Sequence, residues 1–286
     1  MKMENPVIKN GEGKGTSDPY VVMDNGSYYR CYTLEDKMWV SEFSSLSHMG
    51  SEDEKAHIVF EGDGLKEFYA PELHKIDGKW YIYAAPCTID DANHFMAVFE
   101  AQTENPCGKY KYIGTIDGIG KKWAIDATIF EYCNKRYMIY TDCRTLFLSE
   151  MESPNRLKGK TVPLTSSEYD WEKVMSPVVE GPFVVFDKDV PCIVYSASDS
   201  QSDDYCLGLL RFSGENILDT ASWHKHPKPI LSKQEGMYGP GHCSFTYADD
   251  EMYCIYHANL ESGTGWNGRS VFVKKAYFEE GVIVFE

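Results

Sequence analysis

One pattern recurs five times along this chain of 286 residues. Each copy has an apolar stretch, a two-residue turn candidate seven residues after its first position, and a second apolar stretch, which is typical of a β-hairpin. The copies are DPYVVMDNGSYYRCYT from Asp18, APELHKIDGKWYIYAA from Ala70, DATIFEYCNKRYMIYT from Asp126, EGPFVVFDKDVPCIVYS from Glu180 and HCSFTYADDEMYCIYHA from His242. The turn candidates are Asn25-Gly26, Asp77-Gly78, Cys133-Asn134, Asp187-Lys188 and Asp249-Asp250.

The spacing of the copies predicts an all-β fold, a five-bladed β-propeller. Successive copies begin 52 to 62 residues apart, which is the size of a propeller blade. One hairpin supplies only the inner half of a four-stranded blade, so the stretches between copies should supply the outer strands. Apolar runs at 94–102, 146–151 and 205–212 suit that role. Without a linker or low-complexity tract, residues 1–286 are interpreted as one propeller domain whose ends meet to close the ring.

Charge and cysteine usage narrow the partners and the compartment. A net charge of −16 repels nucleic acid and anionic membrane surfaces, and no apolar run is long enough to suggest a membrane span or a signal peptide. The nine cysteines are spread without metal-site or disulfide spacing. We therefore expect reduced, buried thiols and a cytoplasmic protein, with secretion after removal of a leader as the alternative.

Four of the five first positions of the repeat are ionisable: Asp18, Asp126, Glu180 and His242. Because the innermost strands of a propeller line its axis, side chains at one phase of the repeat should gather at one end of the channel. A single acid at such a position is commonly a turn former. Three carboxylates and a histidine at the same phase favour a catalytic ring.

The order of the blades predicts a role for each carboxylate. Copies one and four are not neighbours in a ring of five, so Asp18 and Glu180 should face each other across the axis. Inverting glycosidic hydrolysis needs a general acid and a general base about 6.5 to 9.5 Å apart. Asp126 belongs to the blade beside Glu180, where a second negative charge raises the pKa of an acid. We therefore predict Asp18 as general base, Glu180 as general acid, and Asp126 as the residue that tunes and orients the acid.

The segments around these positions resemble glycoside hydrolase family 43. The resemblance rests on SDPYV at Asp18, YAPELHKIDGKWYIY (69–83), WAIDATIFE (123–131), VVEGPFV at Glu180 and YGPGHCSF (238–245). It implies a five-bladed propeller and an inverting α-L-arabinofuranosidase, β-xylosidase or arabinanase. Segments 105–116, 165–174 and 195–210 look most like exo-acting α-L-arabinofuranosidases, which implies release of terminal L-arabinofuranose from arabino-oligosaccharides or arabinoxylan fragments.

The same resemblance implies further site residues. Arg269 matches an arginine that contacts sugar hydroxyls, and His242 matches a histidine near an ion or water cluster on the axis, commonly calcium. Because calcium prefers oxygen ligands, we expect His242 to contact it through water, as a structural ion that the chemistry does not require.

Tyr69 and Trp123 lie close to ring positions and are predicted to stack on the sugar, with core packing as the alternative. The expected partner is a small oligosaccharide. The competing functions are β-xylosidase, endo-arabinanase and a non-catalytic glycan-binding propeller.

Overall fold

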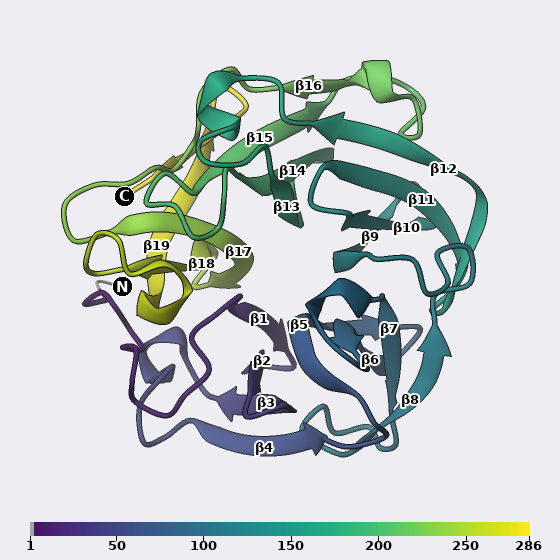
Figure 1. The fold of residues 1–286 in the computed structure, drawn as a ribbon, viewed down its shortest axis with the longest axis vertical. Coiled ribbons are helices and arrows are strands. Elements are labelled where there is room, and N and C mark those ends of the chain that lie inside the picture. Colours follow the sequence, from purple (N-terminus) through teal and green to yellow (C-terminus); the bar gives the residue numbers. More distant parts are fainter. Residues whose placement is uncertain (1–2) are drawn as a thin grey trace.

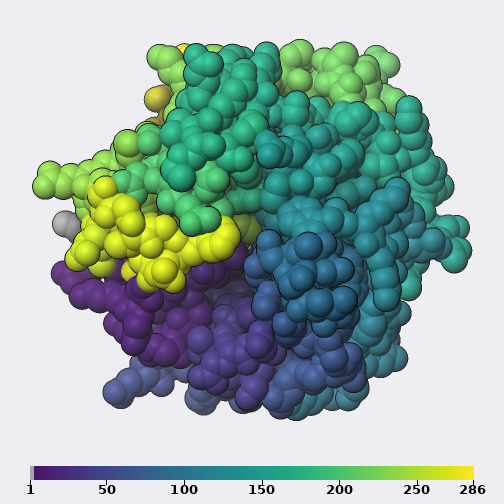
Figure 2. All heavy atoms as spheres, in the orientation of Figure 1, coloured from purple at the N-terminus to yellow at the C-terminus, as the bar shows by residue number. Residues whose placement is uncertain are grey.

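The computed structural model describes residues 3–286, which form five four-stranded antiparallel sheets around a central axis (Figure 1). Each sheet contains four strands consecutive in the chain, and the sheets follow one another around the ring in chain order. The innermost strands are those that open each repeat. The predicted five-bladed propeller is therefore confirmed. Seen down the axis, the molecule is hollowed near the centre of this face (Figure 2).

The strand bounds are as follows. Blade one contains β1 (Tyr20–Asp24), β2 (Ser27–Leu34), β3 (Lys37–Phe43) and β4 (Lys55–Phe60), and blade two contains β5 (Lys66–Ile76), β6 (Lys79–Cys87), β7 (Ala97–Ala101) and β8 (Tyr110–Thr115). Blade three contains β9 (Ile125–Tyr132), β10 (Lys135–Thr141), β11 (Thr145–Ser153) and β12 (Arg156–Ser166), and blade four contains β13 (Val179–Asp187), β14 (Val190–Ala197), β15 (Cys206–Phe212) and β16 (Trp223–Lys225). Blade five contains β17 (Tyr238–Ala248), β18 (Glu251–Asn259), β19 (Arg269–Glu279) and β20 (Val282–Phe285). Short 3-10 turns are η1 (Leu46–His48), η2 (Asp91–Asn93), η3 (Asp170–Glu172), η4 (Thr220–Ser222) and η5 (Gly265–Gly268).

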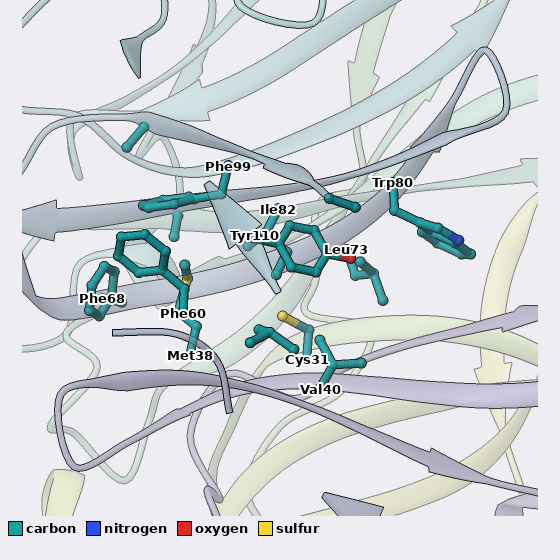
Figure 3. Packing of buried hydrophobic residues seen from close by; sticks show 14 of the residues in the cluster. Cys31, Met38, Val40, Phe60, Phe68, Leu73, Trp80, Ile82, Phe99 and Tyr110 are labelled. Atoms are coloured by element: carbon teal, nitrogen blue, oxygen red, sulfur yellow. The ribbon is translucent and has the colours of Figure 1, made fainter. Parts of the chain in front are cut away.

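Apolar side chains join each blade to the next. Within the described residues, five buried clusters form, one at each blade interface. Between blades one and two, Phe60 and Phe99 pack with ring centroids 4.6 Å apart, and Trp80 lies in the same cluster (Figure 3). Full burial of such a side chain contributes about 1.5–3 kcal/mol, so the ring is held mainly by these interfaces.

The N-terminal segment docks on blade five. Ile8 forms an antiparallel bridge with Val271 of β19, and the side chain of Asn5 exchanges two hydrogen bonds with the backbone of Val273. The last strand, β20, also pairs with β19. Both ends of the described chain therefore meet in blade five, as the repeat predicted.

The innermost strands carry an irregularity at their first positions. In blades two to five the register shifts near Ala70, Asp126, Gly181 and His242, as in a β-bulge, which re-aims side chains. These four residues and Asp18 all have positive φ, between 41° and 57°. Non-glycine residues rarely adopt this conformation, and its clustering is typical of functional sites.

The register corrects one part of the sequence interpretation. In blade four the residue with positive φ is Gly181, and the hairpin turn lies at Lys188-Asp189 instead of Asp187-Lys188. Glu180 therefore lies one residue before the position that Asp18, Asp126 and His242 occupy in their blades. The error arose because both alignments keep the apolar pattern of VVEGPFVV, and only strand pairing distinguishes them.

All nine cysteines lie within the described chain; none forms a disulfide there, and six are buried. The described residues contain no helix long and apolar enough to cross a membrane.

Candidate active site

A pocket of about 570 Å³ opens where the bulged ends of the inner strands meet. Seven residues predicted from the sequence line this pocket together: Asp18, Tyr69, Trp123, Asp126, Glu180, His242 and Arg269. Because these residues come from all parts of the chain between 18 and 269, closure of the ring is what assembles the site.

Three side-chain nitrogens surround the carboxylate of Asp18. Its Oδ1 is 3.2 Å from Nδ1 of His242, 3.4 Å from Nδ1 of His257 and 3.3 Å from a terminal nitrogen of Arg269. Burial would raise the pKa of Asp18, but His242, His257 and Arg269 outweigh it and hold the pKa well below its usual range. Asp18 is therefore a carboxylate at neutral pH, which is the form a general base requires.

Glu180 has the opposite electrostatic surroundings. Burial and the nearby charge of Asp126 raise its pKa to about 7. The Tyr205 hydroxyl donates a 2.8 Å hydrogen bond to Oε1, and the Cys143 thiol lies 3.4 Å from Oε2. A substantial fraction of Glu180 is protonated near neutral pH, as a general acid must be.

Asp126 is held beside Glu180 by the backbone. Its Oδ2 accepts a 2.9 Å hydrogen bond from the N–H of Gly181, and burial raises its pKa to about 6. A Cβ on Gly181 would approach Cγ of His242 to 3.0 Å at a φ of +52°, so only glycine fits here without strain. Because Gly181 takes the bulged position, Glu180 precedes it and still lines the pocket.

His242 lies at the first position of blade five, as predicted, and is buried. Burial would lower its pKa, but Asp18, Asp126 and Glu180 raise it above the ordinary value. Among residues 3–286, no group of three or more His, Cys, Asp or Glu ligand atoms that could hold a metal includes His242. The surroundings therefore suit a protonated imidazole.

Glu72 and His74 form a separate buried pair, with Oε2 and Nε2 2.8 Å apart. Burial raises the pKa of Glu72 to about 8 and lowers that of His74 to about 3. Both groups are therefore mainly uncharged at neutral pH, and their hydrogen bond gives Glu72 a structural partner.

The two aromatic residues predicted to stack on a sugar are held from behind. Tyr69 stacks on His94 with ring centroids 3.9 Å apart and donates a 3.1 Å hydrogen bond to Asp91. Nε1 of Trp123 donates to the backbone oxygen of Asp91. Both side chains line the pocket and also pack against the apolar cluster between blades two and three. Their position in the pocket suits sugar contact, and the core-packing alternative holds in part.

Several pocket residues were missed by sequence reasoning: Asp91, Cys143 and Trp266 line the pocket, and Tyr205 contacts Glu180. None stands at the repeated phase. Trp266 lies in η5, between β18 and β19, and donates a hydrogen bond from Nε1 to Ser200. The one available signal was a tryptophan in the segment GTGWNGR (263–269), outside the five repeats; in the structure it is exposed by 53%.

Comparison with known proteins shows which family this chain belongs to. The family model for glycosyl hydrolases family 43 matches residues 3–283, nearly the whole chain. The chain belongs to this family.

Three relatives show the extent of the similarity. An extracellular exo-α-(1→5)-L-arabinofuranosidase of Streptomyces chartreusis is 32% identical over 89% of this chain and 82% of its own length. An enzyme of the same name from Streptomyces avermitilis is 31% identical over 84% of this chain but only 54% of its own length. The crystal structure of an α-L-arabinofuranosidase from Lactobacillus brevis superposes with a TM-score of 0.88 at 27% identity, over 98% of this chain and 94% of that one.

Proposed function

We propose that this family 43 glycoside hydrolase is an exo-acting α-L-arabinofuranosidase that inverts the anomeric centre. The observation that carries the proposal is the pair of opposed pKa shifts in one pocket, downward at Asp18 and upward at Glu180. The names of the Streptomyces and Lactobacillus relatives support arabinofuranose as the sugar.

In the proposed mechanism the protonated carboxyl of Glu180 gives its proton to the leaving glycosidic oxygen. Asp18 takes a proton from a water molecule, whose oxygen attacks the anomeric carbon from the opposite face in a single displacement. Asp126 keeps the pKa of Glu180 raised. Arg269, which bonds Asp18 and the backbone oxygen of Ser200, and the rings of Tyr69 and Trp123 position the sugar.

Leaving-group dependence tests the role of Glu180. We would compare 4-nitrophenyl α-L-arabinofuranoside with α-1,5-linked arabino-oligosaccharides in the wild type and in Glu180→Gln. 4-Nitrophenol leaves with little protonation, so the variant should lose about 10²- to 10⁴-fold in kcat on the oligosaccharides and far less on the aryl glycoside. Equal losses on both substrates would contradict the general-acid role.

The sugar and the stereochemistry need their own measurements. 4-Nitrophenyl β-D-xyloside should be cleaved much more slowly than the arabinofuranoside; the reverse preference would favour a β-xylosidase. Proton NMR of the first-formed sugar should show the inverted anomer, and Asp18→Asn should lose turnover on every substrate. Oligosaccharide binding without turnover by the wild type would identify a glycan-binding propeller.

We also propose a structural calcium ion on the propeller axis, which His242 contacts through water. If it is present, adding calcium after chelation should raise the unfolding temperature.

We further propose a reducing, cytoplasmic location, which the unpaired cysteines support. Two relatives are named extracellular enzymes. Cell fractionation with an antibody would decide between these locations.

A further inference from the structure

A second cluster of ligating side chains lies behind one wall of the pocket. It contains Glu67 near the start of β5, Cys87 at the end of β6 and His94 before β7. One ligand atom from each lies within 4.8 Å of the other two. The three residues are separated by 20 and 7 positions in the sequence, and the pairing of β5 with β6 brings Glu67 and Cys87 together.

The orientation of His94 indicates a ligand. Its side chain is fully buried, and Nδ1 lies 2.7 Å from the backbone oxygen of Ala85. A carbonyl oxygen only accepts, so Nδ1 carries the proton and Nε2 presents a lone pair. Nε2 is buried and has no hydrogen-bond partner. A histidine whose other nitrogen donates to a backbone carbonyl is the usual arrangement of a metal-binding imidazole.

The distances around Nε2 fit a small tetrahedral ion. Nε2 is 3.9 Å from Oε2 of Glu67 and 3.6 Å from Oδ1 of Asp91, and Sγ of Cys87 is 3.6 Å from the same Glu67 oxygen. Bonds of about 2.0 Å to nitrogen or oxygen and about 2.3 Å to sulfur at tetrahedral angles separate ligand atoms by about 3.3 to 3.6 Å. Nε2 of His94 and Sγ of Cys87 lie within 4.8 Å of each other, so binding would draw the ligand atoms closer around the ion.

We propose that Glu67, Cys87 and His94 bind a zinc-type divalent cation, with the fourth position taken by water or Asp91. A thiolate, an imidazole and a carboxylate suit zinc, whereas calcium and magnesium prefer oxygen alone. On binding, the Cys87 thiol releases its proton to solvent. The thiolate and the Glu67 carboxylate then balance the two positive charges of the ion.

Such an ion would stiffen the wall on which a sugar is proposed to stack. Tyr69 lies flat on His94 and hydrogen bonds Asp91, which also accepts from Trp123. Glu67 and Asp91 line the pocket, so exchange of the ion with solvent is open from that side. The site contains none of the residues assigned to acid or base catalysis, so its occupancy is tested independently of glycosidase activity.

The experiment uses the whole chain, purified with a chelator and transferred to chelator-free buffer. Titration calorimetry with Zn²⁺ should give one site per chain, and Co²⁺ should produce an absorption band from thiolate-to-cobalt charge transfer. Mutation of a residue that only hydrogen bonds a metal ligand already changes metal affinity about 10- to 100-fold. Loss of a direct ligand in Cys87→Ser or His94→Gln should therefore weaken Zn²⁺ binding at least as much.

Two further variants keep the test decisive. Glu67 is partly exposed, so Glu67→Gln should fold even if replacement of His94 fails, and it should also weaken Zn²⁺ binding. Cys133 is the exposed cysteine, and Cys133→Ser should bind like the wild type. Absence of stoichiometric Zn²⁺ binding by the wild type, or a cobalt band that survives Cys87→Ser and disappears in Cys133→Ser, would overturn the proposal.

Discussion

The N–H of Gly181 donates a 2.9 Å hydrogen bond to Oδ2 of Asp126, and this bond ties the start of blade four to the start of blade three. Glu180 is therefore held next to Asp126, whose charge helps raise the pKa of Glu180 to about 7. Through this bond, Gly181 at the bulged position fixes Glu180, the residue before it, beside Asp126.

We expect Gly181→Ala to reduce both stability and activity. Alanine at φ +52° would lose about 1–2 kcal/mol to left-handed backbone strain, and its Cβ would also press on His242 at 3.0 Å. Gly78→Ala is the matched control, because φ is +81° there and a Cβ would meet no atom within 4 Å. Urea unfolding should show a larger loss for Gly181→Ala than for Gly78→Ala, and kcat should fall only in the former. Equal losses of stability in the two variants would show that contact between a Cβ at position 181 and His242 is not destabilising.

Asp126→Asn should move the alkaline limb of the pH profile of kcat/KM to lower pH. In the proposed mechanism activity needs protonated Glu180, so it should decline as pH rises through the pKa of Glu180, about 7 in the wild type. Asparagine keeps an oxygen for the Gly181 N–H but removes the negative charge, which lowers the pKa of Glu180. An unchanged or upward-shifted limb would argue against the tuning role.

Tyr205→Phe should move the same limb in the opposite direction. The hydroxyl of Tyr205 donates to Oε1 of Glu180 and favours the ionised form. A hydrogen bond to a charged group is worth about 1.5–3 kcal/mol, so its loss should move the limb upward by about one to two pH units. The ring of phenylalanine still fills the space beside Gly241. Thermal unfolding close to that of the wild type would establish that packing is intact.

Arg269→Lys should raise KM and reduce kcat/KM by roughly 10- to 100-fold, about 1.4–2.7 kcal/mol. Lysine retains the charge that helps to lower the pKa of Asp18 but cannot reproduce the forked contact with Asp18 and Ser200. Lys275→Arg, on the outer part of β19 away from the pocket, is the control. The hypothesis that Arg269 positions the sugar is wrong if Arg269→Lys keeps the wild-type KM.

Glu72→Gln tests whether the buried carboxyl of blade two takes part in the chemistry. Glutamine keeps an oxygen and a donor for the 2.8 Å bond with His74, and Glu72 is already mainly protonated at neutral pH, since burial raises its pKa to about 8. We expect kcat at pH 6 to change by less than about threefold, and stability to change little. A loss comparable with that of Glu180→Gln on arabino-oligosaccharides would make Glu72 a participant in the chemistry.

The sequence by itself determined the blade count and most of the ring. Five hairpins with turns such as Asn25-Gly26 and Asp77-Gly78 set the inner strands, because turn geometry and alternating apolar residues specify a hairpin locally. The repeat also predicted that Asp18, Asp126 and His242 occupy the same position in their blades.

Tertiary structure alone decided how these groups act on one another. The one-residue offset of Glu180 depends on strand pairing, because β13 carries apolar side chains on both faces and its apolar pattern therefore does not distinguish the two registers. The contacts of Asp18 with His257 and Arg269, and of Glu180 with Tyr205 and Cys143, join residues 25 to 251 positions apart in the sequence. The local pattern around a residue sets the phase of its own strand, whereas the distance between charges in different blades, and with it each pKa, is set by closure of the ring.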